Sequence, residues 1–387
     1  MIKSILDNDF YKFTMQKATV NLFPRAVVKY QFINRSHTKF PDGFDKILLE
    51  NIKEMSRLKL TKEEKDFLIS RCYFLDPAYI DFLAGYRFDS DEVTVSCIEG
   101  NLEINIVGYW YRAIMWEVPL MALVSELYFH ILGEPTLPEN EIQKNAEEKM
   151  KFYESLGVRV SDFGTRRRYS YNNHDKIIQT LTKFSNKTFL GTSNVHFAQK
   201  YGVSPMGTQA HEWFMFHAAK YGFKMATTFA LEHWIDIYRG DLGIALSDTF
   251  TTDLFFLHFD TKQAKLFDGV RHDSGDPIIF AQKTINHYKS LGIDPTTKSI
   301  VFSDSLTPDK VKEIRDFCSE KIRFSFGIGT NFTNDVGVTP LNIVIKMTEA
   351  KPEGRGWVNT IKLSDEETKH TGDPETIDLC KRVIENH

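Results

Sequence analysis

Seven short polar motifs each stand at the downstream end of an apolar run in this chain of 387 residues. The apolar runs are rich in β-branched residues and alternate with segments of helical spacing, a pattern typical of parallel βα units. In an α/β barrel, the loops after the carboxyl ends of the parallel strands form the active site. The pattern therefore predicts an enzyme whose chemistry is carried by the following motifs: Asp162-Phe163-Gly164, Gly191-Thr192-Ser193-Asn194, Gly207-Thr208-Gln209-Ala210-His211, Ser247-Asp248-Thr249, residues 268–276, Ser303-Asp304-Ser305 and Gly327-Ile328-Gly329-Thr330.

The predicted fold class is α/β: an irregular barrel similar to a TIM barrel, with a second α+β domain. The chain is long enough for a barrel of roughly 200 to 250 residues and another domain. Residues 1–125, which mix helical segments with strands and a hairpin near 93–107, are expected to form the α+β domain. Residues 126–349 are expected to form the barrel, with about eight candidate strands that include 265–267 and 341–346. The charged tail, 350–387, is expected to join the first domain.

The net charge and the cysteines indicate which partners and which cellular compartment to expect. The net charge is −4, so the overall charge does not attract nucleic acid. The chain lacks a Cys-x-x-Cys pair, and we interpret the four cysteines as reduced packing thiols of a cytoplasmic protein. The N-terminus has no signal-peptide pattern, and we expect no membrane-spanning stretch.

The late motif 327–330 is a candidate phosphate site. Backbone N–H groups in a glycine-rich turn can surround a phosphate, and barrel phosphate sites often use the loops after late strands. An ordinary turn between a strand and a loop would have the same residues. The position in the order of strands favours the phosphate interpretation.

The loop 268–276 combines three acidic residues with Arg271 and His272. Carboxylates such as Asp273 and Asp276 can bind Mg²⁺ or accept ribose hydroxyls, and Arg271 can bind a carboxylate or phosphate. A lone Asp would more often be a solvated turn residue. Asp304, after the next strand, is expected to face the same site.

An aromatic ring and a run of arginines follow the strand that ends near residue 162. Phe163 with an arginine three residues on suits a flat anionic ring, which it would bind by stacking and charge pairing. A core Phe beside surface arginines is the competing interpretation. The sequence does not show which of Arg166, Arg167 and Arg168 touches a ligand.

His211 stands at a predicted helix start and is a candidate nucleophile or base. Asp248, which ends the next strand, is well placed to hold one ring nitrogen and leave the other to react. Most single histidines are structural, and this remains the alternative. Neither His-x₃-His nor His-Glu-x-x-His occurs, which argues against zinc hydrolysis.

Together these motifs resemble those of the nicotinate phosphoribosyltransferase family over most of the chain. The resemblance implies an irregular α/β barrel, an α+β domain and a homodimer with shared active sites. It also implies that nicotinate, 5-phosphoribosyl 1-pyrophosphate and ATP react, with Mg²⁺, to nicotinate mononucleotide and pyrophosphate in NAD salvage. The most specific segments are Asp162-Phe163-Gly164-Thr165-Arg166-Arg167, Gly207-Thr208-Gln209-Ala210-His211-Glu212-Trp213, Arg271-His272-Asp273-Ser274-Gly275-Asp276-Pro277 and Phe326-Gly327-Ile328-Gly329-Thr330.

The resemblance assigns roles to single residues. ATP would phosphorylate His211, with Asp248 orienting the ring, and Asp273 would face the ribose. Phe163 would stack on the pyridine ring, with Arg271 in the same pocket. The remaining residues expected to contact substrate are Tyr11 (from the partner subunit), Arg166, Thr192, Ser193, Asp276, Asp304, Gly327, Gly329 and Thr330.

Ser193 distinguishes the chain from a relative that uses nicotinamide. That relative has Asp at this position, where it accepts from the amide, whereas Asp would repel a carboxylate substrate. The sequence therefore favours the acid over the amide. An aldolase or lyase would need a Schiff-base lysine at a strand end, and the motifs contain no convincing one. A non-catalytic nucleotide-binding regulator does not explain so many charged groups at one rim.

Overall fold

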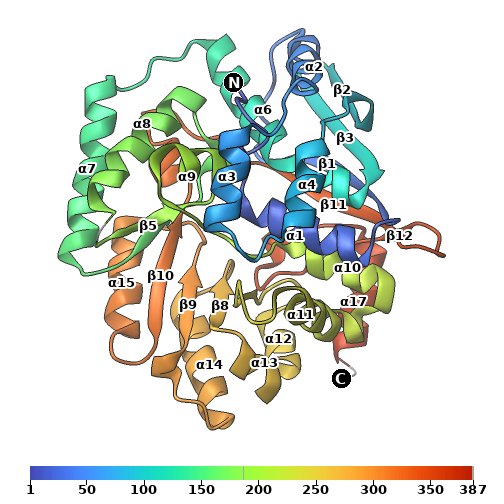
Figure 1. The fold of residues 1–387 in the computed structure, drawn as a ribbon, viewed down its shortest axis with the longest axis vertical. Helices are drawn as coiled ribbons and strands as arrows, with labels where there is room; N and C mark the ends of the chain where they lie inside the picture. Colours follow the sequence, from blue (N-terminus) through green and yellow to red (C-terminus); the bar gives the residue numbers. More distant parts are fainter. Residues whose placement is uncertain (186, 386–387) are drawn as a thin grey trace. The chain divides into compact units, whose positions relative to one another are not determined.

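The computed structural model describes residues 1–185 and 187–385, and Figure 1 shows their helices and strands. These residues fall into two compact units. Each unit is assembled from segments that are distant in the sequence. The first comprises Met1–Pro24, Val28–Gly207 and Ile328–Lys346, and the second takes Arg25–Val27, Thr208–Gly327 and the described residues from Met347 on. The predicted domain boundaries after residues 125 and 349 stay predictions.

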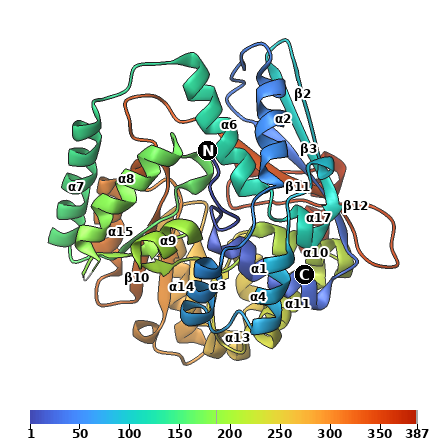
Figure 2. The ribbon, with the colours of Figure 1, turned by 45° about the horizontal axis from the view of Figure 1, so that its top comes forward.

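The first unit contains the predicted antiparallel hairpin. Strand β2 (Val93–Ile98) pairs antiparallel along its whole length with the first six residues of β3 (Asn101–Tyr109). The turn between them uses the left-handed backbone at Glu99 and Gly100, with φ of 49° and 75°. Helix α2 (Phe44–Met55) packs against β2, as Figure 2 shows. This part confirms the expectation of an α+β region near the N-terminus.

Parallel βα units complete the first unit. Strands β4 (Val160–Asp162), β5 (Phe189–Thr192) and β6 (Ser204–Pro205) pair in parallel. Helix α8 (Tyr171–Leu181) connects β4 to β5, and α9 (Val195–Tyr201) connects β5 to β6. The remaining helices and strand of this unit are α1 (Phe10–Leu22), β1 (Val27–Asn34), α3 (Lys62–Arg71), α4 (Pro77–Gly85), α5 (Trp110–Ala113), α6 (Glu117–Leu132), α7 (Glu139–Ser155) and α16 (Thr330–Thr333).

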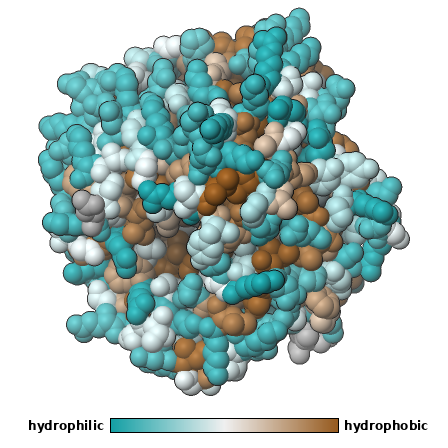
Figure 3. Space-filling model, in the orientation of Figure 1, coloured by the Kyte–Doolittle hydropathy of each residue, from teal (hydrophilic) through white to brown (hydrophobic). Residues whose placement is uncertain are grey.

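Helix α7 shows how sequence periodicity places these helices. Its buried residues, Ile142, Ala146, Met150 and Tyr153, recur every three or four positions and form one apolar stripe. The charged residues between them face solvent, and the outer surface of α7 is correspondingly hydrophilic at the left of Figure 3.

The second unit is built on strands β7 (Ile244–Leu246), β8 (Gly269–His272), β9 (Ser299–Phe302) and β10 (Arg323–Ile328). They pair in parallel in the order β10-β9-β8-β7. Gly269 is required by packing, because an added Cβ would lie 1.9 Å from the Ser299 carbonyl oxygen. The helices are α10 (His211–Tyr221), α11 (Phe223–Tyr238), α12 (Thr252–His258), α13 (Thr261–Leu266), α14 (Pro277–Ser290), α15 (Pro308–Cys318) and α17 (Pro374–Glu385).

Two expected barrel strands have other structures. Residues 265–267 close α13 because the Asp260 carboxylate caps that helix by accepting from Lys262 N and Gln263 N. The strand begins only at Gly269. The expected strand at 341–346 is part of β11 (Ile343–Lys351), which pairs antiparallel with β12 (Val358–Asn359). The fold class is nevertheless confirmed. Parallel strands alternate with helices in one sheet, and the antiparallel pairs belong to a different sheet.

One stretch, Trp110–Leu132, corrects the expectation that no segment resembles a membrane span. It is long and apolar enough to cross a membrane by length and composition. However, 78% of its most apolar window is buried inside the protein, as in a core helix.

A buried ion pair ties distant segments of the first unit together. Arg168 donates to both oxygens of Asp7, at 2.7 and 3.0 Å, and both side chains are fully buried. Asn194 Nδ2 also donates to Asp7, at 2.8 Å. Burial alone would raise the pKa of Asp7, but Arg168 and Asn194 lower it. This assigns Arg168 to the fold and removes it from the arginines that could meet a ligand.

We predict that Asp7→Leu strongly destabilises the protein. The change leaves the Arg168 guanidinium buried without its counterion, which costs about 3–5 kcal/mol. Urea unfolding would measure the loss. Glu54→Ala removes the exposed pair Arg57–Glu54 and serves as the control, with little change expected. Equal stability of Asp7→Leu and the wild type would contradict a structural role for this pair.

Candidate active site

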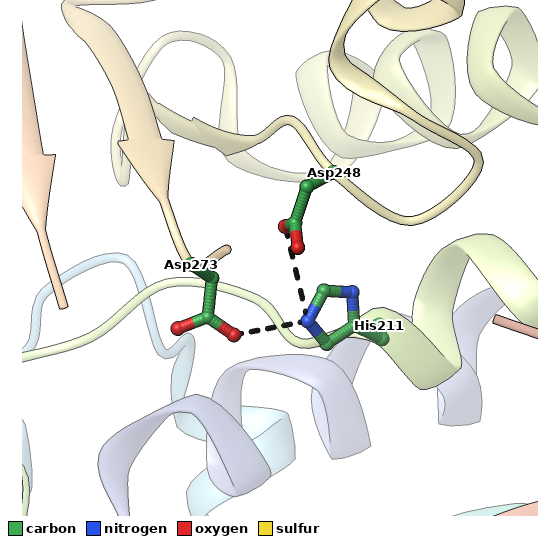
Figure 4. Close-up of side chains that lie close together, drawn as sticks. All are labelled: His211, Asp248 and Asp273. Carbon is green, nitrogen blue, oxygen red and sulfur yellow. Dashed lines mark hydrogen bonds and ion pairs between the residues drawn. The ribbon is translucent and has the colours of Figure 1, made fainter. Parts of the chain in front are cut away.

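A histidine and two carboxylates meet at the strand ends of the second unit. His211 is the first residue of α10, Asp273 directly follows β8, and Asp248 follows β7 (Figure 4). His211 Nε2 lies 3.0 Å from Asp273 Oδ2 and 3.9 Å from Asp248 Oδ1. Three of the residues expected in the site are therefore neighbours in space.

The partners of His211 define which ring nitrogen carries the proton. Burial opposes ionisation of Asp273, but Arg271 and then His211 hold its pKa well below the ordinary value, so this carboxylate only accepts. Nε2 must therefore be the donor. Nδ1 keeps its lone pair and accepts from Thr249 Oγ1 at 3.0 Å. The arrangement yields an oriented, neutral imidazole with one basic nitrogen.

Burial keeps this imidazole neutral. It is the largest influence on His211, and together with the Lys362 ammonium it lowers the pKa of His211 to about 4, against the opposing effect of Asp248 and Asp273. A neutral ring is a nucleophile over the whole physiological range.

Asp248 is held by a lysine and a serine. Lys362 Nζ lies 3.3 Å from its Oδ2, and Ser274 Oγ donates to the same oxygen at 2.6 Å. Burial acts against ionisation, yet Lys362 and His211 lower the pKa of Asp248. Among the described residues Oδ1 has no hydrogen-bond partner. Asp273, rather than Asp248, makes the hydrogen bond to His211, and the orienting role expected of Asp248 stays a prediction.

The other acidic residues expected here have structural partners. Ser303 Oγ donates to Asp273 Oδ1 at 2.8 Å. Asp276 caps α14 by accepting from Ile278 N and Ile279 N, and Lys369 Nζ donates to Asp304 Oδ2 at 2.9 Å. Contact of Asp276 and Asp304 with substrate stays a prediction.

A segment that the sequence interpretation missed binds three of these strand-end loops. Residues 362–369, here called the C-terminal strap, lie within the second unit. Leu363 N donates to Thr249 O at 2.9 Å, and Gly275 N donates to Glu366 Oε1 at 2.8 Å. With Lys362 on Asp248 and Lys369 on Asp304, the strap contacts the loops after β7, β8 and β9. A lysine between two apolar residues, Ile361 and Leu363, was the available signal.

In the first unit, Asp162 shapes the turn that presents Phe163. Its carboxylate accepts from Gly164 N at 2.9 Å, from Thr192 Oγ1 at 2.6 Å and from His174 Nε2 at 2.8 Å. Phe163 N donates to Ile328 O at 2.8 Å. Phe163 is half-buried, which leaves part of the residue accessible. Thr192 thus supports this turn, and its contact with substrate stays a prediction.

The space at Gly164 is closed by the segment that follows β10. An added Cβ would lie 2.3 Å from Thr333 Oγ1, which donates to the Gly164 carbonyl oxygen. The backbone at Gly329 passes close to the same turn, since an added Cβ would meet Phe163 O at 3.6 Å. Phosphate binding by Gly327, Gly329 and Thr330 stays a prediction.

Ser193 has a buried carboxylate as its partner. Its Oγ donates to Asp9 Oδ1 at 2.7 Å, and its carbonyl oxygen accepts from Phe10 N at 2.7 Å. Burial raises the pKa of Asp9, although Arg166 and Ser193 oppose this effect. The serine therefore shares its hydroxyl with Asp9 in this state. Tyr11, also expected in the site, is buried on α1.

Cations of the first unit surround one carboxylate near Arg166. Glu117 Oε2 pairs with buried Lys12 at 2.5 Å, and Glu117 Oε1 lies 3.5 Å from Arg166 Nη1. Burial alone would raise the pKa of Glu117, but Lys12, Arg166 and Lys346 lower it to about 2. Arg166 is partly exposed, and its guanidinium can pair with an anionic ligand.

The residues expected to share one cavity form two groups, one in each unit. Phe163, Ser193 and Gly329 belong to the first unit, and their convergence with the second group stays a prediction. The second group consists of His211, Asp248, Arg271 and Asp273, of which Arg271 Nη1 donates to Gln209 O at 3.0 Å.

Two family models match the chain. The model of the nicotinate phosphoribosyltransferase family matches residues 158–387, and the model of its N-terminal domain matches residues 6–125. Together they cover most of the chain.

Relatives and solved structures agree with these matches. A nicotinate phosphoribosyltransferase of Chromohalobacter salexigens is 56% identical over 384 residues, covering 99% of this chain and 98% of the relative. The crystal structure of a nicotinate phosphoribosyltransferase from Porphyromonas gingivalis has a TM-score of 0.97 at 45% identity, and each chain covers 100% of the other. That from Vibrio cholerae has a TM-score of 0.92 at 34% identity, with coverage of 100% and 94%.

We predict that the His211 ring titrates near pH 4. Its pKa is lowered from the ordinary 6.5 on folding, so the unfolded chain binds more protons between these values. The stability that this site contributes is therefore complete above about pH 6.5 and is lost as the pH falls toward 4. An NMR titration of the ring C–H signals, assigned by their loss in His211→Asn, would measure the midpoint. A midpoint at or above 6.5 would show that the two carboxylates outweigh burial.

Proposed function

The chain belongs to the nicotinate phosphoribosyltransferase family, and from this membership we propose an ATP-dependent reaction with a phosphohistidine at His211. Nicotinate and 5-phosphoribosyl 1-pyrophosphate, the substrates of the family, give nicotinate mononucleotide and pyrophosphate in NAD biosynthesis. ATP is hydrolysed to ADP and phosphate in the same cycle. The observation that carries the proposal is the buried His211 ring, whose Nε2 lies 3.0 Å from the Asp273 carboxylate and whose Nδ1 lies 3.0 Å from Thr249 Oγ1.

This geometry supports the following phosphoryl step. The lone pair on the ring nitrogen forms a bond to the γ-phosphorus of ATP, and the bond from that phosphorus to the bridging oxygen breaks, with ADP leaving. The ring retains its Nε2 proton and becomes positive, which Asp273 at 3.0 Å stabilises. Thr249, which donates to Nδ1, rotates away as the nitrogen reacts. Water later cleaves the N–P bond and restores the neutral ring.

Phe163 and Arg166 of the first unit support the proposed recognition of nicotinate. Phe163, which is half-buried, offers a ring for the pyridine, and Arg166 offers a guanidinium for its carboxylate. The pyridine nitrogen attacks the anomeric carbon of the ribose as pyrophosphate leaves. This nitrogen carries no proton, so the step requires no general base. Ser193, unlike Asp, adds no negative charge beside the substrate carboxylate.

The donor set of the second unit fits Mg²⁺. Hard cations prefer oxygen ligands, and the Asp248 Oδ1 atom is buried without a hydrogen-bond partner among the described residues. His211, Asp248 and Asp273 place their donor atoms within 4.8 Å of one another. Asp248 and Asp273 would hold the ion. When bound, Mg²⁺ would neutralise charge on the leaving pyrophosphate.

We further propose a cytoplasmic homodimer in which Tyr11 reaches the site of the partner subunit. The family resemblance supports the dimer. The cysteines Cys72, Cys97, Cys318 and Cys380 are all free, which agrees with a reducing compartment. Sedimentation of the purified protein would test the dimer.

We predict that His211→Asn abolishes transfer of label from γ-³²P-ATP to the protein. Asn can keep a hydrogen bond to Asp273 but has no nucleophilic nitrogen. Synthesis without ATP is expected to survive in part, because the pyridine pocket is intact. Trapping of the labelled protein and assay of pyrophosphate release would measure both. Label retained by the variant would exclude His211 as the acceptor.

We predict that Arg166→Ala weakens use of nicotinate while Arg167→Ala has little effect. Loss of a charge-assisted pair costs roughly 1.5–3 kcal/mol, or about 10- to 150-fold in kcat/KM. Nicotinamide lacks the carboxylate, so its weak turnover should change far less. Steady-state kinetics with both substrates would test this. Equal losses for both substrates would place Arg166 outside carboxylate recognition.

A further inference from the structure

The C-terminal strap brings a buried lysine to the His211 cluster. Lys362 is 5% exposed, and its Nζ lies 3.3 Å from Asp248 Oδ2. The opposite oxygen of that carboxylate lies 3.9 Å from His211 Nε2. The ammonium and the imidazole therefore flank the same carboxylate, and the Lys362 charge acts on His211, Asp248 and Asp273 alike.

The strap fixes the backbone on either side of this lysine. Leu363 N donates to Thr249 O at 2.9 Å, and Asp365 N donates to Ser274 Oγ at 3.2 Å. Thr252 N donates to Asp365 Oδ1 at 2.7 Å. Each of these bonds ends on a loop that carries a partner of His211. These hydrogen bonds hold the backbone next to Lys362. Its ammonium is carried by a flexible four-carbon side chain.

Charge balance changes when a phosphoryl group arrives. A phosphorylated side chain carries about −1.5 to −2 charges, and Asp248 and Asp273 are already negative. Arg271 balances Asp273, but its Nη1 is tied to the Gln209 carbonyl oxygen at 3.0 Å. Lys362 balances the charge of Asp248, and its ammonium can shift because it stands on a flexible side chain. The phosphoryl group on Nδ1 adds its charge to a ring whose Nε2 already faces two carboxylates, so a positive charge that can move to the phosphoryl oxygens would favour the transfer.

We propose that Lys362 is a further catalytic residue, whose ammonium moves from Asp248 to the phosphoryl oxygens as the phosphoryl group passes from ATP to His211. This inference rests on the proposed phosphohistidine. In the step, the N–P bond forms and the P–O bond to ADP breaks. Lys362 exchanges no proton, and its charge stabilises the transferring group. Hydrolysis of the phosphohistidine returns the ammonium to Asp248.

The alternative is that Lys362 is only the structural counterion of Asp248. The two roles differ in what they affect. A structural role predicts equal loss of every activity together with stability. A catalytic role predicts loss of phosphoryl transfer, while synthesis from nicotinate and 5-phosphoribosyl 1-pyrophosphate without ATP continues.

The test uses the full chain with Lys362→Gln, Lys362→Arg and the control Lys381→Gln. Lys381 lies on α17, is 41% exposed and pairs only loosely with Glu367, at 4.0 Å. Single-turnover labelling with γ-³²P-ATP, synthesis without ATP and thermal melting are measured for each. We expect Lys362→Gln to label at least about a hundredfold more slowly, as for loss of one charged contact to a transition state. Synthesis without ATP is expected to fall much less than labelling, and Lys362→Arg recovers labelling to within about tenfold, because it keeps the charge.

The outcomes separate the two proposals. If the wild type is labelled and Lys362→Gln is labelled equally fast, the role of Lys362 is refuted and the phosphohistidine stands. If Lys362→Gln loses labelling and ATP-independent synthesis in proportion, Lys362 is structural. If the wild type takes no label, the phosphohistidine fails and this inference with it. Should Lys362→Gln not melt cooperatively, Lys362→Met, which keeps the apolar stem, replaces it at reduced temperature.

Discussion

The cost of burying charge governs the second unit. A neutral imidazole beside two carboxylates is stable in the interior only when each carboxylate has its own cation, and these cations are Lys362 and Arg271. Without them, the ring would take up a proton and lose its lone pair. The need of each buried carboxylate for a nearby cation therefore favours one arrangement of the site. It involves the strap, the loops after β7, β8 and β9, and the start of α10.

Strand ends explain why much of this site could be predicted from the sequence. Asp248, Asp273 and His211 each follow an apolar run or open a helix, and the fold brings such positions together. Their relative distances could not be predicted. Asp273 hydrogen-bonds the ring and Asp248 does not, a difference of about 0.9 Å that no residue spacing encodes. Thr249 lay inside a recognised motif, yet nothing in its type indicated a bond to Nδ1.

Lys362 escaped prediction for a different reason. It is separated from the strand-end motifs in the sequence and follows no βα unit, so periodicity carries no information about its partner. The predicted strand at 265–267 was wrong because a local helix cap outweighed the apolar composition. Asp260 caps α13, and residues 265–267 lie at the end of that helix. The three arginines after Phe163 look alike in sequence, and the structure separates them by the burial of Arg168 against Asp7 and the contact of Arg166 with Glu117.

The two units use buried counter-charges with opposite results. In the first, the charges of Lys12, Arg166 and Lys346 all act on the Glu117 carboxylate and lower its pKa. In the second, carboxylates and cations balance around His211, and burial lowers the pKa of the ring, which favours its neutral form. An excess of positive charge attracts an anionic ligand at all times, whereas a cluster of balanced charges responds only when a charge is added. This difference agrees with the proposed roles, which are substrate binding in the first unit and acceptance of a phosphoryl group by His211 in the second.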